Sequence, residues 1–88
     1  MIWHVYIVKC IDDSLYTGIT TDISRRVIEH NNSKLGAKSL KGKRPVTLVY
    51  SENYDTQSEA RKREAAIKQW KREYKLKLIE RSTEQGLP

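Results

Sequence analysis

The chain has 88 residues, of which 38% are hydrophobic, and 17 lysine and arginine residues against 11 aspartate and glutamate residues give a formal net charge of +6. This length suits one domain with a modest core and is too short for two domains that each hold their own. The single cysteine excludes an internal disulfide and a cysteine cluster for metal. No apolar run approaches the ~20 residues that span a bilayer, and the N-terminus lacks a signal-peptide pattern, so we expect a soluble, cytoplasmic protein.

The N-terminal segment predicts a β-hairpin. Residues 3–10 are mainly aromatic and β-branched, which is typical of a strand. An acidic turn follows, and residues 14–19 form a second strand, so the two strands should pair antiparallel. This pairing brings Tyr6 near Tyr16. On the pattern alone both are well explained as ordinary strand aromatics.

Residues 22–32 predict the first helix. At ~100° per residue, Arg26 and His30 lie on its apolar face, whereas Arg25 and Glu29 face solvent as an ion pair four residues apart. Desolvating an arginine costs free energy unless an anion meets it. The inward Arg26 is therefore the first indication of a functional site.

Basic residues are concentrated after this helix. Residues 34–45 contain five cations, two glycines and no acidic residue. A loop of this length is usually functional or disordered, and we interpret it as a mobile basic arm, although a solvated connector explains the composition equally well. The charge favours a partner that carries phosphate. The candidate phosphate ligands are Lys34, Lys38, Lys41, Lys43, Arg44, Arg63 and Lys71.

The remaining pattern completes an α+β fold. The predicted elements are strands over 3–10, 14–19 and 46–51 and helices over 22–32, 57–70 and 72–81. We expect a small three-stranded antiparallel sheet flanked by helices, in the order β-β-α-β-α-α, as one domain over residues 1–81 with a frayed tail over 82–88. The pattern leaves open whether the last two helices are continuous.

Glu64 borders the apolar stripe of the helix predicted over residues 57–70. A carboxylate in such a position requires a cation from the protein, a bound metal ion or a proton. Glu64 is therefore the second candidate for a functional site.

The order of these features resembles the GIY-YIG nuclease superfamily. The order consists of two tyrosine-bearing strands, a helix with an inward arginine and histidine, a third strand, and a helix with an inward glutamate. The two signatures of the family appear here as His4-Val5-Tyr6 and Tyr16-Thr17-Gly18. The segments Gly36-Ala37-Lys38, 44–50 and 63–68 are similar to those of its small stand-alone bacterial members. The resemblance covers the chain to about Ile79.

The resemblance implies an endonuclease that hydrolyses phosphodiester bonds with a single Mg²⁺ or Mn²⁺ ion. Glu64 matches the metal-binding glutamate, and Arg26 matches the arginine that binds the scissile phosphate. Tyr6 is the implied general base, and Tyr16 and His30 position water or phosphate. The implied partner is nucleic acid, with DNA favoured over RNA, bound by a monomer or weak dimer without membrane association.

Two other functions stay open. A basic nucleic-acid-binding module would keep the scaffold but cleave poorly or only with a partner, and the short chain favours it because no appended DNA-binding region directs cleavage. A basic structural protein of a ribonucleoprotein particle would leave the inward-facing Arg26 and Glu64 unexplained.

Overall fold

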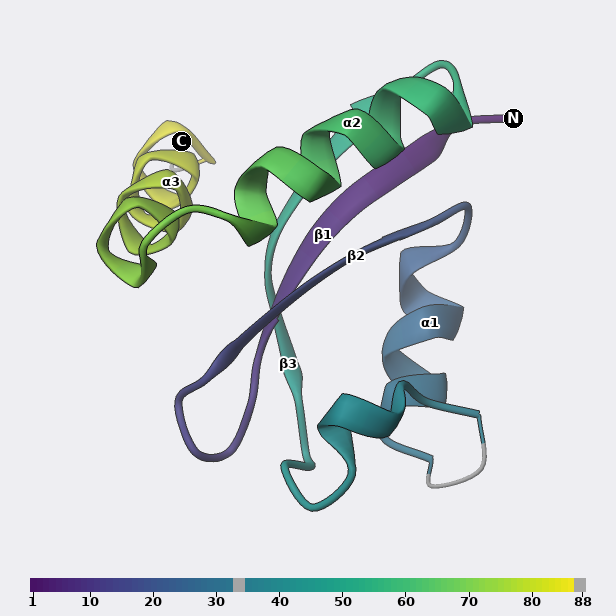
Figure 1. Cartoon of the computed structure of the whole chain (residues 1–88), viewed down its shortest axis with the longest axis vertical. Coiled ribbons are helices and arrows are strands. Elements are labelled where there is room, and N and C mark those ends of the chain that lie inside the picture. Colours follow the sequence, from purple (N-terminus) through teal and green to yellow (C-terminus); the bar gives the residue numbers. More distant parts are fainter. Residues whose placement is uncertain (33–34, 87–88) are drawn as a thin grey trace.

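The computed structural model describes residues 1–32 and 35–86, the last four of these as backbone only. Three antiparallel strands form one sheet in the order β2-β1-β3. The elements are β1 (Trp3–Lys9), β2 (Leu15–Thr20), α1 (Ile23–His30), the 3₁₀ helix η1 (Lys38–Leu40), β3 (Thr47–Tyr54), α2 (Gln57–Lys68) and α3 (Arg72–Gly86) (Figure 1). The predicted α+β class and element order are confirmed.

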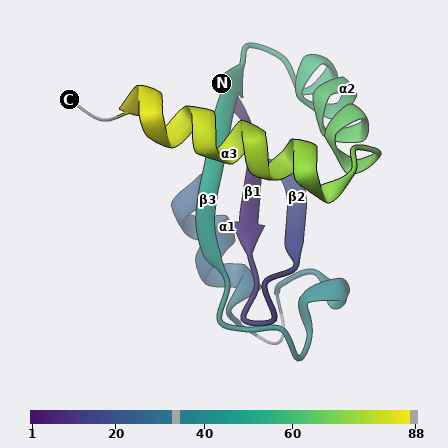
Figure 2. The ribbon, with the colours of Figure 1, turned by 90° about the vertical axis from the view of Figure 1, so that its left-hand side faces the viewer.

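The central strand β1 separates two hydrophobic clusters. Successive side chains of a strand point to opposite faces of the sheet. Tyr6 and Val8 accordingly pack with side chains of α1 and the η1 region, whereas Val5 and Ile7 pack with side chains of α2 and α3. Figure 2 shows α3 crossing one face of the sheet and α1 on the opposite face. The sheet therefore has a helical layer on each face.

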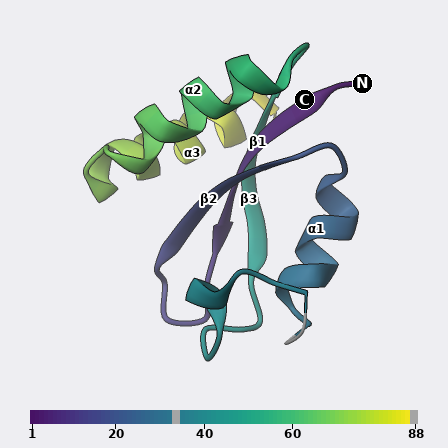
Figure 3. The same ribbon diagram turned by 45° about the vertical axis from the view of Figure 1, so that its right-hand side comes forward.

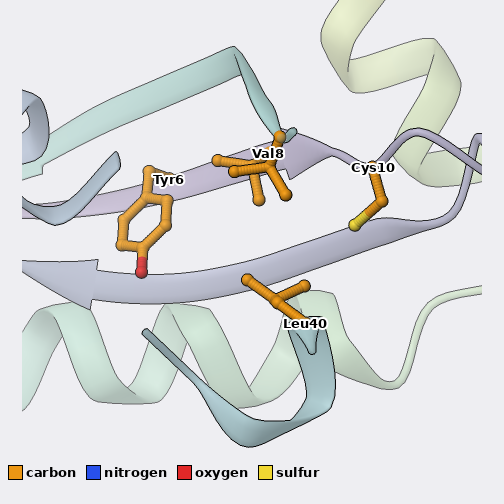
Figure 4. Close-up of a cluster of buried hydrophobic side chains, with 5 residues drawn as sticks. Tyr6, Val8, Cys10 and Leu40 are labelled. Atoms are coloured by element: carbon orange, nitrogen blue, oxygen red, sulfur yellow. The ribbon is translucent and has the colours of Figure 1, made fainter. Parts of the chain in front are cut away.

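The basic loop is anchored by an apolar side chain. Leu40 on η1 is 2% exposed and belongs to the cluster that contains Tyr6 and Val8. Figure 4 shows Leu40 facing the side chains that β1 carries on this face of the sheet. The N–H of Ile11 also donates to the carbonyl of Lys43, at 3.0 Å. The described part of this loop is thus packed against the hairpin, in contrast to the mobile arm that we expected.

Two elements are longer than the sequence predicts. β3 continues to Tyr54, beyond the predicted end at residue 51, because it pairs along the whole length of β1, up to the partner Trp3. α2 ends at Lys68 and α3 begins at Arg72, so the two helices are separate. α3 continues to Gly86, and the segment expected to be frayed is helical to that point.

α1 is shorter than predicted, because it ends at His30 instead of residue 32. The next residue, Asn31, caps the helix, and its side chain makes two hydrogen bonds to the backbone of Val46. Oδ1 accepts from the N–H at 2.7 Å, and Nδ2 donates to the carbonyl at 3.2 Å. Asn31 therefore fixes the end of α1 to the segment that enters β3.

None of the helices in the described ranges is long and apolar enough to cross a membrane.

Candidate active site

The hydroxyl of Tyr6 lies at the centre of the candidate site. Tyr6 is 1% exposed on the central strand, and its partner on β2 is Gly18. A Cβ atom added to Gly18 would lie 2.5 Å from Tyr6 Oη and 2.7 Å from Tyr6 Cζ. The ring of Tyr6 therefore occupies the space above Gly18 that a side chain would fill.

His30 holds the Tyr6 hydroxyl from the opposite side. It is the last residue of α1 and is 1% exposed, and its Nε2 lies 2.6 Å from Tyr6 Oη. Its other ring nitrogen, Nδ1, accepts a hydrogen bond from the N–H of Ala37 at 3.3 Å. Burial, together with the nearby charge of Arg26, lowers the pKa of His30 to about 4, so the imidazole is neutral at neutral pH.

Tyr16 completes an aromatic group with these two residues. Its ring centroid lies 6.4 Å from that of Tyr6 and 5.1 Å from that of His30, which it meets edge-on at 68°. The antiparallel hairpin thus brings the two tyrosines together, as the sequence predicts. Burial and the neighbouring Tyr16, opposed in part by the Arg26 guanidinium, raise the pKa of Tyr6 to about 12. Tyr6 is therefore a neutral phenol in the resting protein.

Arg26 supplies the positive charge next to this group. Its Nη1 lies 2.8 Å from Glu29 Oε1 and donates to the carbonyl of Leu35 at 3.1 Å. Glu29 also pairs with Arg25, at 3.9 Å, as the sequence predicts. One carboxylate serves both arginines, because residues three apart on a helix are neighbours as well as those four apart. Arg26 thus has the anionic partner that its half-buried position requires.

Glu64 lies on α2, whose side chains pack on the face of the sheet opposite to Tyr6. Its side chain is 21% exposed, and its carboxylate makes a loose ion pair with Lys68 at 3.7 Å. The negative charge of Glu64 makes a minor contribution to the raised pKa of Tyr6, after burial and Tyr16. Of the three partners that the sequence analysis allows, the structure supplies a cation from the protein, Lys68, whereas Arg26 pairs with Glu29.

The metal-binding capacity of this site is limited. Among the described residues, no group of three or more histidine, cysteine, aspartate or glutamate side chains is arranged to hold a metal ion. The donors that the site does offer are oxygen atoms, on Glu64 and on the tyrosine hydroxyls, and these suit Mg²⁺ or Mn²⁺. The residues therefore fit one divalent ion that takes most of its ligands from water and substrate.

The predicted phosphate ligands lie in different surroundings. Lys38 and Lys41 are exposed on the loop around η1, and Lys71 is exposed between α2 and α3. Lys43 lies 3.9 Å from Asp12, and Arg44 is half-buried. Lys34 lies outside the described residues.

Arg63 is bound within the fold. Its Nε donates to Glu52 Oε1 at 2.7 Å, and its guanidinium lies 5.1 Å from the ring centroid of Trp70. The hydroxyls of Tyr50 and Tyr54 donate to the same carboxylate. Glu52 was missed at the sequence level, although alternation along β3 puts it on one face with both tyrosines. The structure thus gives Arg63 a connecting role between α2 and β3, away from the Tyr6 and His30 pair.

Two further residues escaped the sequence analysis. The N–H of Ala37 reaches His30, and the side chain of Asn31 holds Val46. The only sequence signal for Ala37 was its place in the Gly36-Ala37-Lys38 segment. Asn31 gave no signal beyond a helix end, because its partner is 15 residues away in the chain.

The chain is similar to known proteins over most of its length. Residues 2–77 match the family described as the GIY-YIG catalytic domain. A UPF0213 protein from Staphylococcus saprophyticus is 59% identical over 76 residues, which are 86% of this chain and 92% of the relative.

Two solution NMR structures have a similar fold. The UPF0213 protein BH0048 from Bacillus halodurans is 39% identical, with a TM-score of 0.58 over 91% of this chain and 84% of its own. The protein EF2693 from E. faecalis is 38% identical, with a TM-score of 0.64 over 94% of this chain and 88% of its own.

Proposed function

This chain belongs to the GIY-YIG catalytic domain family, and from that premise we propose that it is an endonuclease that hydrolyses phosphodiester bonds in nucleic acid, preferentially DNA, with one divalent metal ion. The observation that carries the proposal is the buried contact of 2.6 Å between Tyr6 Oη and His30 Nε2, next to Tyr16 and Arg26. Titratable side chains whose pKa values are strongly shifted and that gather in one place are candidates for a functional site, and Tyr6 and His30 are such a pair.

Phosphodiester hydrolysis requires a nucleophilic water, neutralisation of charge on the phosphoryl oxygens and stabilisation of the leaving oxygen. Arg26 would bind the scissile phosphate. Its guanidinium has five N–H donors, and the hydrogen bonds to Glu29 and Leu35 both use Nη1, so donors remain for a phosphate oxygen. The Arg26–Glu29 pair would keep the guanidinium oriented before substrate binds.

Tyr6 would act on the attacking water, with Tyr16 beside it. The pKa of Tyr6, raised to about 12, keeps its proton in the resting protein, so Tyr6 can serve as a base only when positive charge approaches the hydroxyl. Glu64 would hold the divalent ion, which supplies that charge and polarises the phosphate when bound. His30 would keep the hydroxyl in place throughout.

One observation favours a second function. The site has a single carboxylate near the tyrosines, and the described residues contain no larger group of metal-binding side chains. A basic module that binds nucleic acid and cleaves weakly, or only with a partner, would have the same exposed lysines around η1.

Cleavage assays separate the two functions. The purified protein is incubated with end-labelled duplex, single-stranded and branched DNA and RNA of matched sequence, with Mg²⁺, Mn²⁺ or EDTA. A nuclease yields products with a divalent ion and none with EDTA. Binding to the same substrates without products under any condition would reject the nuclease in favour of the binding module.

A further inference from the structure

Gly36 and Ala37 lie against the C-terminal end of α1, in contact with the backbone and the ring of His30. They belong to the connection between α1 and η1 (Figure 3). The N–H of Ala37 points at His30 Nδ1, with a distance of 3.3 Å between the two nitrogen atoms. A backbone N–H can only donate, so Nδ1 must accept and carries no proton in this arrangement. In a neutral imidazole the single ring proton then resides on Nε2.

This tautomer determines the direction of the hydrogen bond to Tyr6. His30 Nε2 lies 2.6 Å from Tyr6 Oη, so a proton on Nε2 makes His30 the donor and the tyrosine oxygen the acceptor. The phenol proton of Tyr6 must consequently point elsewhere. The opposite tautomer would make His30 accept that proton, as a base acting on Tyr6.

We propose that the Ala37 N–H is a positioning group of the active site: it fixes the tautomer of His30, so that His30 donates to Tyr6 Oη and leaves the phenol proton directed toward substrate and water. This inference deepens the proposed nuclease function and rests on it for its catalytic consequence. The tautomer itself is a property of the protein alone.

Gly36 is the residue that lets Ala37 come this close. A Cβ atom at Gly36 would lie 2.7 Å from the carbonyl oxygen of Glu29 and 2.7 Å from His30 Cα. Both are backbone atoms of α1, so neither can move aside as a flexible side chain would. Gly36 also donates its N–H to the carbonyl of Asn32 at 3.2 Å. A methyl group at residue 36 must therefore push the segment, and the Ala37 N–H with it, away from His30.

Nitrogen NMR of the two histidines tests the tautomer directly. In ¹⁵N-labelled protein at pH 7, the imidazole nitrogen shifts and their couplings to the ring protons distinguish the two tautomers. His30 is expected as the Nε2–H form. His4 provides an internal contrast, because its Nδ1 lies 2.6 Å from Asn53 Oδ1, a carboxamide oxygen that only accepts, so His4 is expected as the Nδ1–H form. A His4→Gln variant assigns the signals. A spectrum in which His30 Nδ1 is protonated overturns the proposal.

Two sets of variants test the consequence. Gly36→Ala should shift His30 toward a mixture of tautomers and lower cleavage, whereas Ser39→Ala, at an exposed position on the same loop, should change neither. His30→Gln retains an N–H donor for Tyr6 and should keep more cleavage activity than His30→Phe, in which Tyr6 loses this donor. A Gly36→Ala protein with the wild-type tautomer and rate would overturn the role of the segment. Absence of cleavage in every sample, with the Nε2–H form intact, would reject the nuclease function but not the tautomer.

Discussion

The ring of Tyr6 lies directly above Gly18, its partner on the neighbouring strand, so closely that an added Cβ atom would be 2.5 Å from the tyrosine hydroxyl. The same hydroxyl is 2.6 Å from His30 Nε2 on the other side. The glycine and the histidine thus fix one oxygen atom between them, and each can be changed without altering the other.

Gly18→Ala should displace the Tyr6 ring and both destabilise the protein and reduce cleavage. Overpacking of this kind costs about 1 to 3 kcal/mol, and about 1 kcal/mol lowers the melting temperature of a domain of this size by roughly 4 to 8 °C. Thermal melts of the wild type, the two single variants Gly18→Ala and Tyr6→Ala and the double variant measure this contact. The loss of stability caused by Gly18→Ala should largely disappear when the Tyr6 ring is absent. Equal losses in both backgrounds would contradict the clash.

Glu64→Gln should abolish cleavage while leaving nucleic-acid binding unchanged or tighter. The substitution keeps the shape of the side chain but removes the charge that holds a divalent ion, and a surface that faces phosphate loses a negative charge. Stability should hardly change, because the ion pair with Lys68 is long and partly exposed. Cleavage, binding and melting are measured on one preparation.

The matched control for Glu64 is Glu80→Gln, at an exposed position on α3. It removes the same charge from the protein as a whole and should leave cleavage at the wild-type rate. A Glu64→Gln protein that cleaves as fast as this control would remove the metal-site assignment.

Replacing Lys41, Lys43 and Arg44 together by alanine should weaken nucleic-acid binding and flatten its dependence on salt. Each lost phosphate contact lowers the magnitude of the slope of log K against log salt by about 0.9 on duplex DNA and about 0.7 on a single strand. Titrations at several salt concentrations give the slope. Lys9→Ala is the control, because Lys9 pairs with Asp13 at 3.1 Å. A triple variant with the wild-type slope would place this loop outside the binding footprint.

His30 should make the protein less stable in acid. Its pKa, lowered from 6.5 to about 4 in the folded protein, means that between these values the unfolded chain binds more protons, so stability falls as the pH decreases from about 6.5 to about 4. The loss is at most about 3 kcal/mol, since one pKa unit corresponds to about 1.4 kcal/mol. Urea unfolding at a series of pH values measures it. In His30→Gln this component should be absent, and an unchanged pH profile would show that another group is responsible.

Asn31→Asp should destabilise the fold by about 1 to 3 kcal/mol. Asparagine provides both the acceptor for the Val46 N–H and the donor for the Val46 carbonyl. An aspartate carboxylate can still accept from the Val46 N–H, but it places an oxygen atom opposite the Val46 carbonyl oxygen, where asparagine has its Nδ2 donor. Chemical denaturation at neutral pH measures the change, and Asn31→Ala, which loses both bonds without the repulsion, provides the comparison. An Asp variant as stable as wild type would show that the Nδ2 bond contributes nothing.

The sequence predicts those features that depend on local periodicity. Alternation along the first two strands and the turn between them bring Tyr6 next to Tyr16, and the helical period puts Arg26 and His30 on the inward face of α1. The element order and the sheet follow from the same patterns. The catalytic roles of these residues and of Glu64 stay predictions.

The features that were missed are those that form only when distant segments meet. The ion pair of Glu52 with Arg63 connects residues 11 apart on different elements. The helical period puts Arg63 on the same side of α2 as Glu64, but it gives no indication that the partner of Arg63 is a carboxylate on β3. The local pattern does not predict the buried position of Leu40 either, because Leu35 and Leu40 in a basic loop give no periodic signal that separates the buried residue from the exposed one. The length of β3 depends on the extent of β1, which is a property of the paired sheet.

The position of Tyr6 on the central strand also ties the candidate site to the register of the sheet. A one-residue slip of β1 against its neighbours would turn Tyr6 toward α2 and Val5 toward α1, because side chains alternate along a strand. Such a mispaired chain would disrupt both hydrophobic clusters and would move the Tyr6 hydroxyl away from His30 in the same step. The return of the proposed cleavage activity after dilution from denaturant should therefore follow native strand pairing, so its rate of return would report on the register of the sheet.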